Sequence, residues 1–166
     1  MTVEPNIAGL TTKGNAPLPN GGDGLLISGT AHGNVVGGTL RSVIPQNTFS
    51  GNAGYGVAIT GAAYRNQVFD SFIGTNVLGT EAFGNGRGGV VLAGVARGNV
   101  IGAARRAPVN LISGNAGAGV TLTPGTSRNA VLSNYIGLDR FGRRLSNTGR
   151  PVADFGQHNL IAGNKS

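Results

Sequence analysis

The 166-residue chain contains no cysteine and no tryptophan, only six acidic residues, and no long run of apolar residues. Without cysteine, no disulfide bond can stabilise the fold, so packing and hydrogen bonding must do so. The absence of about eighteen consecutive apolar residues argues against a transmembrane helix. The first residues, MTVEPNIAG, lack the basic and apolar regions of a signal peptide. If the protein is exported, its signal is expected outside this segment.

Glycine and arginine are abundant instead. The chain has 31 glycines, and its thirteen lysines and arginines against six acidic residues give a net charge of +7. The glycines follow no three-residue period, and valine, isoleucine and leucine occur throughout, so neither collagen nor a disordered linker fits. This excess of positive charge is compatible with binding of an anionic partner. GC-rich coding gives the same composition without any such partner, and both interpretations stay open.

A repeat of about thirty residues dominates the sequence and decides the fold class. Four times an asparagine follows a glycine after ten residues, as in GVAITGAAYRN (56–66) and GVVLAGVARGN (89–99). The asparagines recur at intervals of 32, 33, 30 and 30 residues, at Asn34, Asn66, Asn99, Asn129 and Asn159. A longer period of 63 residues relates 47–59 to 110–122. Two slightly different turns of chain are therefore expected to alternate.

Each repeat contains three short segments with the alternating apolar pattern of β-strands, separated by glycine, asparagine or proline. One segment follows the glycine, one begins at the asparagine, and one has the form LISGN (111–115) or FIGTN (72–76). None is long enough for a helix. We predict an all-β fold, a right-handed parallel β-helix of about five turns with three short strands per turn.

In such a coil, equivalent residues of successive turns stack about 4.8 Å apart. Strand parity predicts an interior that includes Val57, Val90, Val120, Ile59, Leu92 and Leu122. The repeated asparagines are expected to face inward and to form a ladder of amide hydrogen bonds. The glycines at 24, 56, 89 and 119 are predicted to provide bends with positive φ. The opposite strand face is predicted to be an outward apolar strip that packs a partner or a loop, formed by Leu26, Ala58, Val91, Thr121 and Ala153.

The whole chain, 1–166, is predicted to form one β-helix domain. It divides into a partial first turn (6–23), four full turns (24–150) and a shortened last turn (151–166). Residues 159–164 fit either the second or the third strand of a turn. Because no capping helix is visible, we expect a segment of a longer protein with neighbouring domains, or end-to-end self-association.

The strings NLISGNAGAGVTL (110–122), GNVIG (98–102) and FIGTNVLGTEAFGNGRGGV (72–90) resemble the repeats of bacterial right-handed parallel β-helix proteins, the pectate-lyase-like superfamily in its broad sense. The resemblance covers about 6–164 and is specific for the fold. The composition also resembles β-helical modules of mycobacterial surface proteins of the PE-PGRS type. The resemblance implies a secreted or cell-surface protein.

Polysaccharide-cleaving enzymes of this fold need several carboxylates that converge on one strand face. The six acidic residues occupy different repeat positions, and Asp70 with Asp139 is the best remaining combination. The alternative function is therefore a carbohydrate-active enzyme, a lyase, hydrolase or epimerase, that acts on an acidic polysaccharide. No cluster of histidine, cysteine and acidic residues has the spacing of metal ligands, so no metal and no cofactor are predicted.

A basic residue precedes the repeated asparagine by one or two positions in every turn. These residues are predicted to form one cationic file along a corner of the coil: His32, Arg65, Arg97, Arg128 and His158. Arg105 and Arg106 form a second basic group on another corner. Closely spaced like charges favour an anionic polysaccharide or a host matrix protein as partner, although arginines solvated for solubility remain the simpler interpretation. The few aromatic residues provide no stacking platform for nucleic acid. We predict a non-catalytic, extracellular or cell-surface module that serves as a spacer or adhesive rod.

Overall fold

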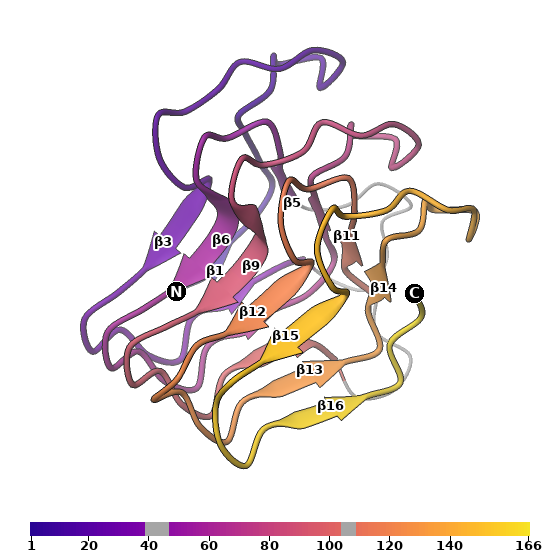
Figure 1. The fold of residues 1–166 in the computed structure, drawn as a ribbon. Helices are drawn as coiled ribbons and strands as arrows, with labels where there is room; N and C mark the ends of the chain where they lie inside the picture. Colours follow the sequence, from indigo (N-terminus) through magenta and orange to yellow (C-terminus); the bar gives the residue numbers. More distant parts are fainter. Residues whose placement is uncertain (39–46, 104–108) are drawn as a thin grey trace.

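The structure is a computed structural model that describes residues 1–38, 47–103 and 109–166. All regular elements of the described residues are β-strands, and they form three parallel sheets. Each turn of the chain adds one strand to each of the three sheets, here numbered 1 to 3 in chain order, and the next turn then begins again in sheet 1. The strands therefore wind as a coil (Figure 1). The predicted β-helix of about five turns with three strands per turn is confirmed.

The strands are short and each sheet contains one strand from every turn. Sheet 1 consists of β1 (Thr2–Val3), β4 (Val35–Val36), β7 (Gln67–Val68), β10 (Val100–Gly102), β13 (Ala130–Leu132) and β16 (Leu160–Ala162). Sheet 2 consists of β2 (Asn6–Ala8), β5 (Asn47–Phe49), β8 (Ser71–Ile73), β11 (Leu111–Ile112) and β14 (Tyr135–Ile136). Sheet 3 consists of β3 (Leu25–Ile27), β6 (Tyr55–Ile59), β9 (Gly88–Leu92), β12 (Val120–Leu122) and β15 (Val152–Asp154).

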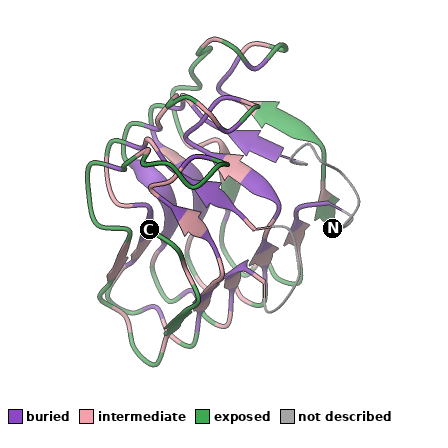
Figure 2. Cartoon of the chain, turned by 90° about the vertical axis from the view of Figure 1, so that its right-hand side faces the viewer, coloured by how far each residue is buried: buried purple, intermediate pink, exposed green. Residues whose placement is uncertain are grey.

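The register places equivalent residues of successive turns directly over one another. In sheet 3, Val57 pairs with Val90 and Val90 with Val120, as the repeat predicts. In sheet 2, Ile112 pairs with Ile73 on one side and Ile136 on the other. These columns are fully buried, and Figure 2 shows the buried residues on the strands of the central turns, with exposed residues in the outer loops and on strands at the ends of the coil. The predicted interior is confirmed.

The coil has three corners, and the corner between sheets 2 and 3 carries insertions in alternate turns. At the corner between sheets 2 and 3, the odd turns form antiparallel hairpins, marked by the bridges Leu10 with Pro17, Thr75 with Ala82 and Leu138 with Arg144. The even turns make a short bend there. This alternation confirms the predicted 63-residue period. The corner between sheets 3 and 1, named here the 3–1 corner, carries no such hairpin in the described residues.

The predicted asparagine ladder lies just after the 3–1 corner. The amide Nδ2 of each rung donates to the Oδ1 of the next, at 2.8 Å from Asn34 to Asn66 and 3.0 Å from Asn66 to Asn99 and from Asn99 to Asn129. The last link, from Asn129 to Asn159, measures 3.3 Å. Each Oδ1 also accepts the backbone N–H of the preceding rung.

A second ladder lies at the corner between sheets 2 and 3, and sequence reasoning missed it. Its rungs are Asn20, Asn52, Asn85, Asn115 and Asn147, joined by side-chain hydrogen bonds of 2.8, 2.9, 2.8 and 2.9 Å. The signal was present in the sequence, because these asparagines recur at intervals of 32, 33, 30 and 32 residues. Two corners of the coil are thus pinned by continuous amide networks.

The second ladder corrects the predicted role of the repeated glycines. Gly24, Gly56, Gly89 and Gly119 do not have positive φ, so they are not left-handed bends. They are required by lack of space: a Cβ on Gly56 would lie against Ile73 and 2.8 Å from Asn85 Nδ2, and one on Gly119 would lie 3.1 Å from Asn147 Nδ2. The glycine column makes room for the second ladder and for the isoleucine column.

The first and last turns differ in detail from the predicted boundaries. β1 already belongs to sheet 1, so the first turn includes residues before residue 6. β16 pairs with β13, which assigns residues 160–162 to the strand after the 3–1 corner. The last turn has two residues fewer between β15 and its ladder asparagine, and there Asp154 Oδ1 accepts hydrogen bonds from Gly156 N and Asn159 Nδ2, both at 2.9 Å.

Candidate functional site

The predicted cationic file at the 3–1 corner is in fact two adjacent files. The residues two positions before the ladder asparagines pair in parallel from turn to turn, and they are His32, Tyr64, Arg97, Ser127 and Gln157. The residues one position before form the other file, which consists of Gly33, Arg65, Gly98, Arg128 and His158. The expectation of five cations stacked about 5 Å apart is therefore wrong, because one- and two-residue offsets place side chains in different files.

In the first file, Tyr64 lies between two cationic or titratable side chains. The imidazole ring of His32 stacks on the Tyr64 ring with centroids 4.6 Å apart and planes inclined by 11°. The guanidinium carbon of Arg97 lies 5.0 Å from the centroid of the same ring. A cation over an aromatic face at an exposed site contributes about 0.5–1 kcal/mol. The stack therefore restricts where the otherwise exposed Arg97 side chain lies.

In the second file the backbone is left-handed. Arg65 and Arg128 both have φ of 54° and His158 has 55°, while Gly33 and Gly98 at the equivalent position have 64° and 62°. Non-glycine residues adopt this conformation at a cost of about 1–2 kcal/mol. The adjacent asparagine ladder fixes the chain on the C-terminal side of each of these residues. Since the backbone is the same in all five turns, the arginine side chains leave the corner from equivalent positions.

The two files line an open hollow beside Gly98. Tyr64, Arg65, Arg97, Gly98 and Arg128 line it, and its volume is about 330 Å³. Arg65 and Arg128 lie one turn to either side of Gly98, so their backbones are about 9.6 Å apart, twice the strand spacing. Gly98 leaves the floor of the hollow open, because a Cβ there would find no atom nearer than Arg65 Cγ at 4.0 Å.

The hollow is strongly cationic. Among the residues that the structure describes, the one ion pair within 4.0 Å joins Asp139 to Arg143, so no described carboxylate pairs with Arg65, Arg97 or Arg128. The positive charges of three arginines that line one hollow raise the local concentration of anions. The second predicted basic group, Arg105 and Arg106, lies outside the described residues.

The structure does not bring the two candidate catalytic carboxylates together. Asp70 directly precedes β8, whereas Asp139 follows β14 by three residues, so they lie beyond opposite ends of the sheet 2 strands. Asp70 is buried, and its Oδ2 has no hydrogen-bond partner among the described residues. Burial, and to a lesser degree the charge of Glu4, raises the pKa of Asp70. Asp70 also has φ of 50°, which aspartate tolerates better than most residues.

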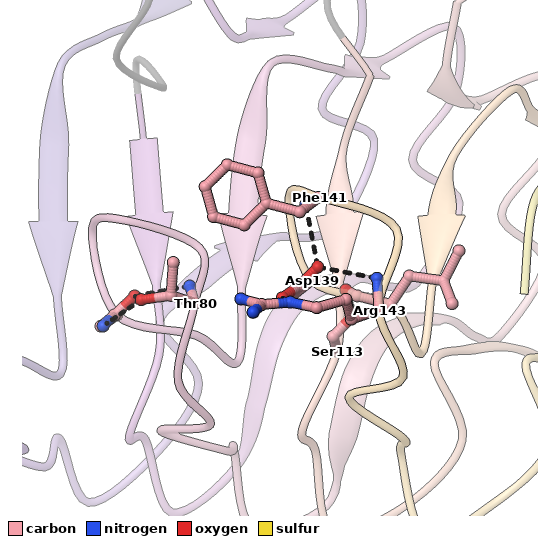
Figure 3. A network of polar contacts seen from close by, with 7 residues as sticks. Thr80, Ser113, Asp139, Phe141 and Arg143 are labelled. Carbon is pink, nitrogen blue, oxygen red and sulfur yellow. Dashed lines mark hydrogen bonds and ion pairs between the residues drawn. The ribbon is translucent and has the colours of Figure 1, made fainter.

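Asp139 stabilises a hairpin. Its Oδ1 accepts the amides of Phe141 and Arg143, both at 2.8 Å, and its Oδ2 pairs with Arg143 Nε at 2.7 Å (Figure 3). Burial opposes its ionisation, but the hydrogen bonds from Arg143 and Phe141 outweigh burial and hold the pKa of Asp139 below its usual range. Asn76 has the same role one hairpin earlier, where its Oδ1 accepts the amide of Thr80 at 3.0 Å. All hydrogen bonds that the structure records for the Asp139 carboxylate are made within its own hairpin.

The predicted outward apolar strip is only partly exposed. Leu26 at the first turn is 56% exposed, but Ala58 and Val91 in the middle of the strip are buried, at 1% and 5%. The prediction of a continuous apolar surface along sheet 3 is therefore wrong in the central turns.

Comparison with known proteins gives no relative for this chain: no family model, no curated protein and no solved structure matches it. The described residues include no helix long and apolar enough to cross a membrane. No group of three or more histidine, cysteine or acidic side chains in residues 1–38, 47–103 and 109–166 is placed to hold a metal ion.

Proposed function

We propose that this protein is a non-catalytic β-helical module of a secreted or cell-surface protein, a rigid rod that binds an anionic polymer along its 3–1 corner. The observation that carries the proposal is the cationic hollow at Gly98, in which three arginines without a described acidic partner surround one open position. An acidic polysaccharide, free or within a host matrix, is the polymer proposed. The resemblance of the repeat to those of bacterial β-helix proteins supports the extracellular location.

The rigidity of the corner favours specific binding of a polymer over nonspecific attraction by the net positive charge. The files rest on a ladder of buried asparagines, so the arginine backbones are held at fixed spacing. A preorganised site binds with a smaller entropic cost than mobile side chains. The stack of His32, Tyr64 and Arg97 adds to this order.

The test is retention on immobilised heparin or another acidic polysaccharide over a salt gradient. The triple variant Arg65→Ser, Arg97→Ser, Arg128→Ser should elute at clearly lower salt than the wild type. A matched triple variant, Arg87→Ser, Arg144→Ser, Arg150→Ser, removes the same charge from exposed residues elsewhere and should elute close to the wild type. Equal shifts for both variants would show that net charge alone causes retention, and no retention of the wild type would overturn the proposal.

A further inference from the structure

We infer that the hollow at Gly98 selects one tetrahedral oxyanion, a sulfate or phosphate ester, over a carboxylate. The inference rests on the proposed binding of an anionic polymer at the 3–1 corner and specifies the chemical group that is bound. It depends on the arrangement of Arg65, Arg97 and Arg128 around one glycine.

The three guanidinium groups come from three different turns of chain. Arg65 belongs to the corner before Gly98, Arg97 to the same corner, and Arg128 to the corner after it. The three arginines therefore line the hollow from the turn before Gly98, from its own turn and from the turn after it. A ligand in the hollow lies within reach of arginine side chains from three successive turns.

This arrangement matches a tetrahedral group better than a planar one. A carboxylate has two oxygens in one plane and accepts best from arginines that lie in or near that plane. A sulfate or phosphate ester has three terminal oxygens directed away from the ester bond, so each can accept hydrogen bonds from a different guanidinium. Three arginines that approach one position from different turns therefore leave at least one of them without a good acceptor when the ligand is a carboxylate.

Gly98 differs from the equivalent residues of the two neighbouring turns, which are arginines. Its equivalents one turn before and one turn after are Arg65 and Arg128, which have nearly the same φ as Gly98. An arginine is therefore compatible with the backbone at position 98, and it would fill the hollow. The missing side chain, rather than a bend that only glycine can form, creates the site.

Among the three arginines of the hollow, Arg97 is the one whose guanidinium stacks on an aromatic ring. Its guanidinium carbon lies 5.0 Å from the Tyr64 ring centroid, and the opposite face of that ring is covered by His32. The equivalent residue in the next turn is Ser127, which has a much shorter side chain than Tyr64. Arg97 is therefore supported by an aromatic ring on one side and has only a small side chain as its neighbour on the other.

The experiment compares dextran sulfate, dextran phosphate and carboxymethyl dextran of equal charge density, with binding measured by calorimetry at fixed ionic strength. The wild type should bind the two esters about tenfold more tightly than carboxymethyl dextran, the difference expected for one charge-assisted hydrogen bond lost. Gly98→Arg should abolish this preference to within about twofold although it adds a positive charge. Gly33→Arg adds the same charge at the equivalent position of the first corner and should keep the preference.

The outcomes separate the inference from the proposed function. If all three dextrans bind the wild type equally, or if Gly98→Arg binds the esters more tightly while the preference persists, the tetrahedral site is refuted and polymer binding stands. If none of the dextrans binds, the proposed function itself fails. Preference for only the sulfate or only the phosphate polymer supports the site and identifies the source of the ester. Circular dichroism spectra should show that both arginine variants retain the β-helix.

Discussion

Replacing Asn99 with alanine removes the central rung of the ladder at the 3–1 corner. The Asn99 side chain is fully buried and makes four hydrogen bonds. Its Oδ1 accepts the backbone N–H and the Nδ2 of Asn66, both at 3.0 Å. Its Nδ2 donates to Asn129 Oδ1 at 3.0 Å and to Ala63 O at 3.1 Å. The substitution breaks all four at once.

The cost follows from which partners are left without a hydrogen bond. Asn66 Nδ2 still donates to Ala31 O, Ala63 O still accepts the amide of Arg97, and Asn129 Oδ1 still accepts the backbone N–H of residue 99. The backbone N–H of Asn66 loses its recorded acceptor in a buried place. An orphaned buried donor costs about 1–3 kcal/mol, and the three weakened partners and the small cavity raise the total to about 2–4 kcal/mol.

Chemical denaturation followed by far-ultraviolet circular dichroism measures this cost. A loss of about 3 kcal/mol lowers the midpoint of thermal unfolding by about 6–12 °C for a chain of this length. Asn159→Ala is the matched control. Asn159 is the last rung and is partly exposed, so water can replace its amide, and we expect less than about 1 kcal/mol. Hydrogen exchange at the Asn66 amide should accelerate only in the Asn99 variant.

Equal destabilisation of the two variants, or unchanged protection of the Asn66 amide in Asn99→Ala, would refute the reasoning. Either result would mean that the ladder does not supply the stability attributed to its buried rungs.

Two further predictions test the packing and the electrostatics. Gly89→Ala places a Cβ against Ile112 and 2.5 Å from Gly119 O, so it should cost about 3 kcal/mol, whereas Gly29→Ala at positive φ with open space should cost about 1 kcal/mol in urea titration. Asp70→Asn should raise stability at neutral pH. Because its folded pKa is raised, Asp70 makes the wild type lose stability as pH rises through its unfolded and then its folded pKa. Denaturation at pH 4 and 7 should show this loss in the wild type alone.

The spacing of the repeat made the strand order and the first ladder predictable. A residue that returns every turn must stack on its equivalent, so the sequence interval between Asn66 and Asn99 translates directly into one step of the coil. The same logic applied to Asn85 and Asn115, but those residues follow the bend after sheet 2, where the neighbouring glycines suggested turns instead of a packed amide. Spacing alone does not tell whether a glycine serves a bend or a close contact.

The candidate site was predictable in composition but not in geometry. The sequence places a basic residue near every ladder asparagine, and the structure places these residues at the 3–1 corner. It did not separate Arg97, two residues before its asparagine, from Arg65 and Arg128, one residue before theirs. Positive φ at the latter position changes the side-chain direction, and strand parity cannot describe it. The stack of Tyr64 on His32 had no sequence signal, because contacts between side chains of different turns depend on exact register.

The two-turn period follows from the width of a hairpin. A hairpin has two antiparallel segments and needs about 9.6 Å along the coil, whereas one turn rises by about 4.8 Å. Hairpins at the same corner are therefore expected only in alternate turns, and the even turns there make glycine bends whose amides bond the hairpins, as Gly51 N does to Phe83 O at 2.7 Å. In the part of the chain that the structure describes, the 3–1 corner has no such hairpin, so every turn presents one residue at each position. A polymer that binds along the coil needs side chains at regular spacing, and this corner provides them. The cationic hollow at Gly98 lies at the same corner.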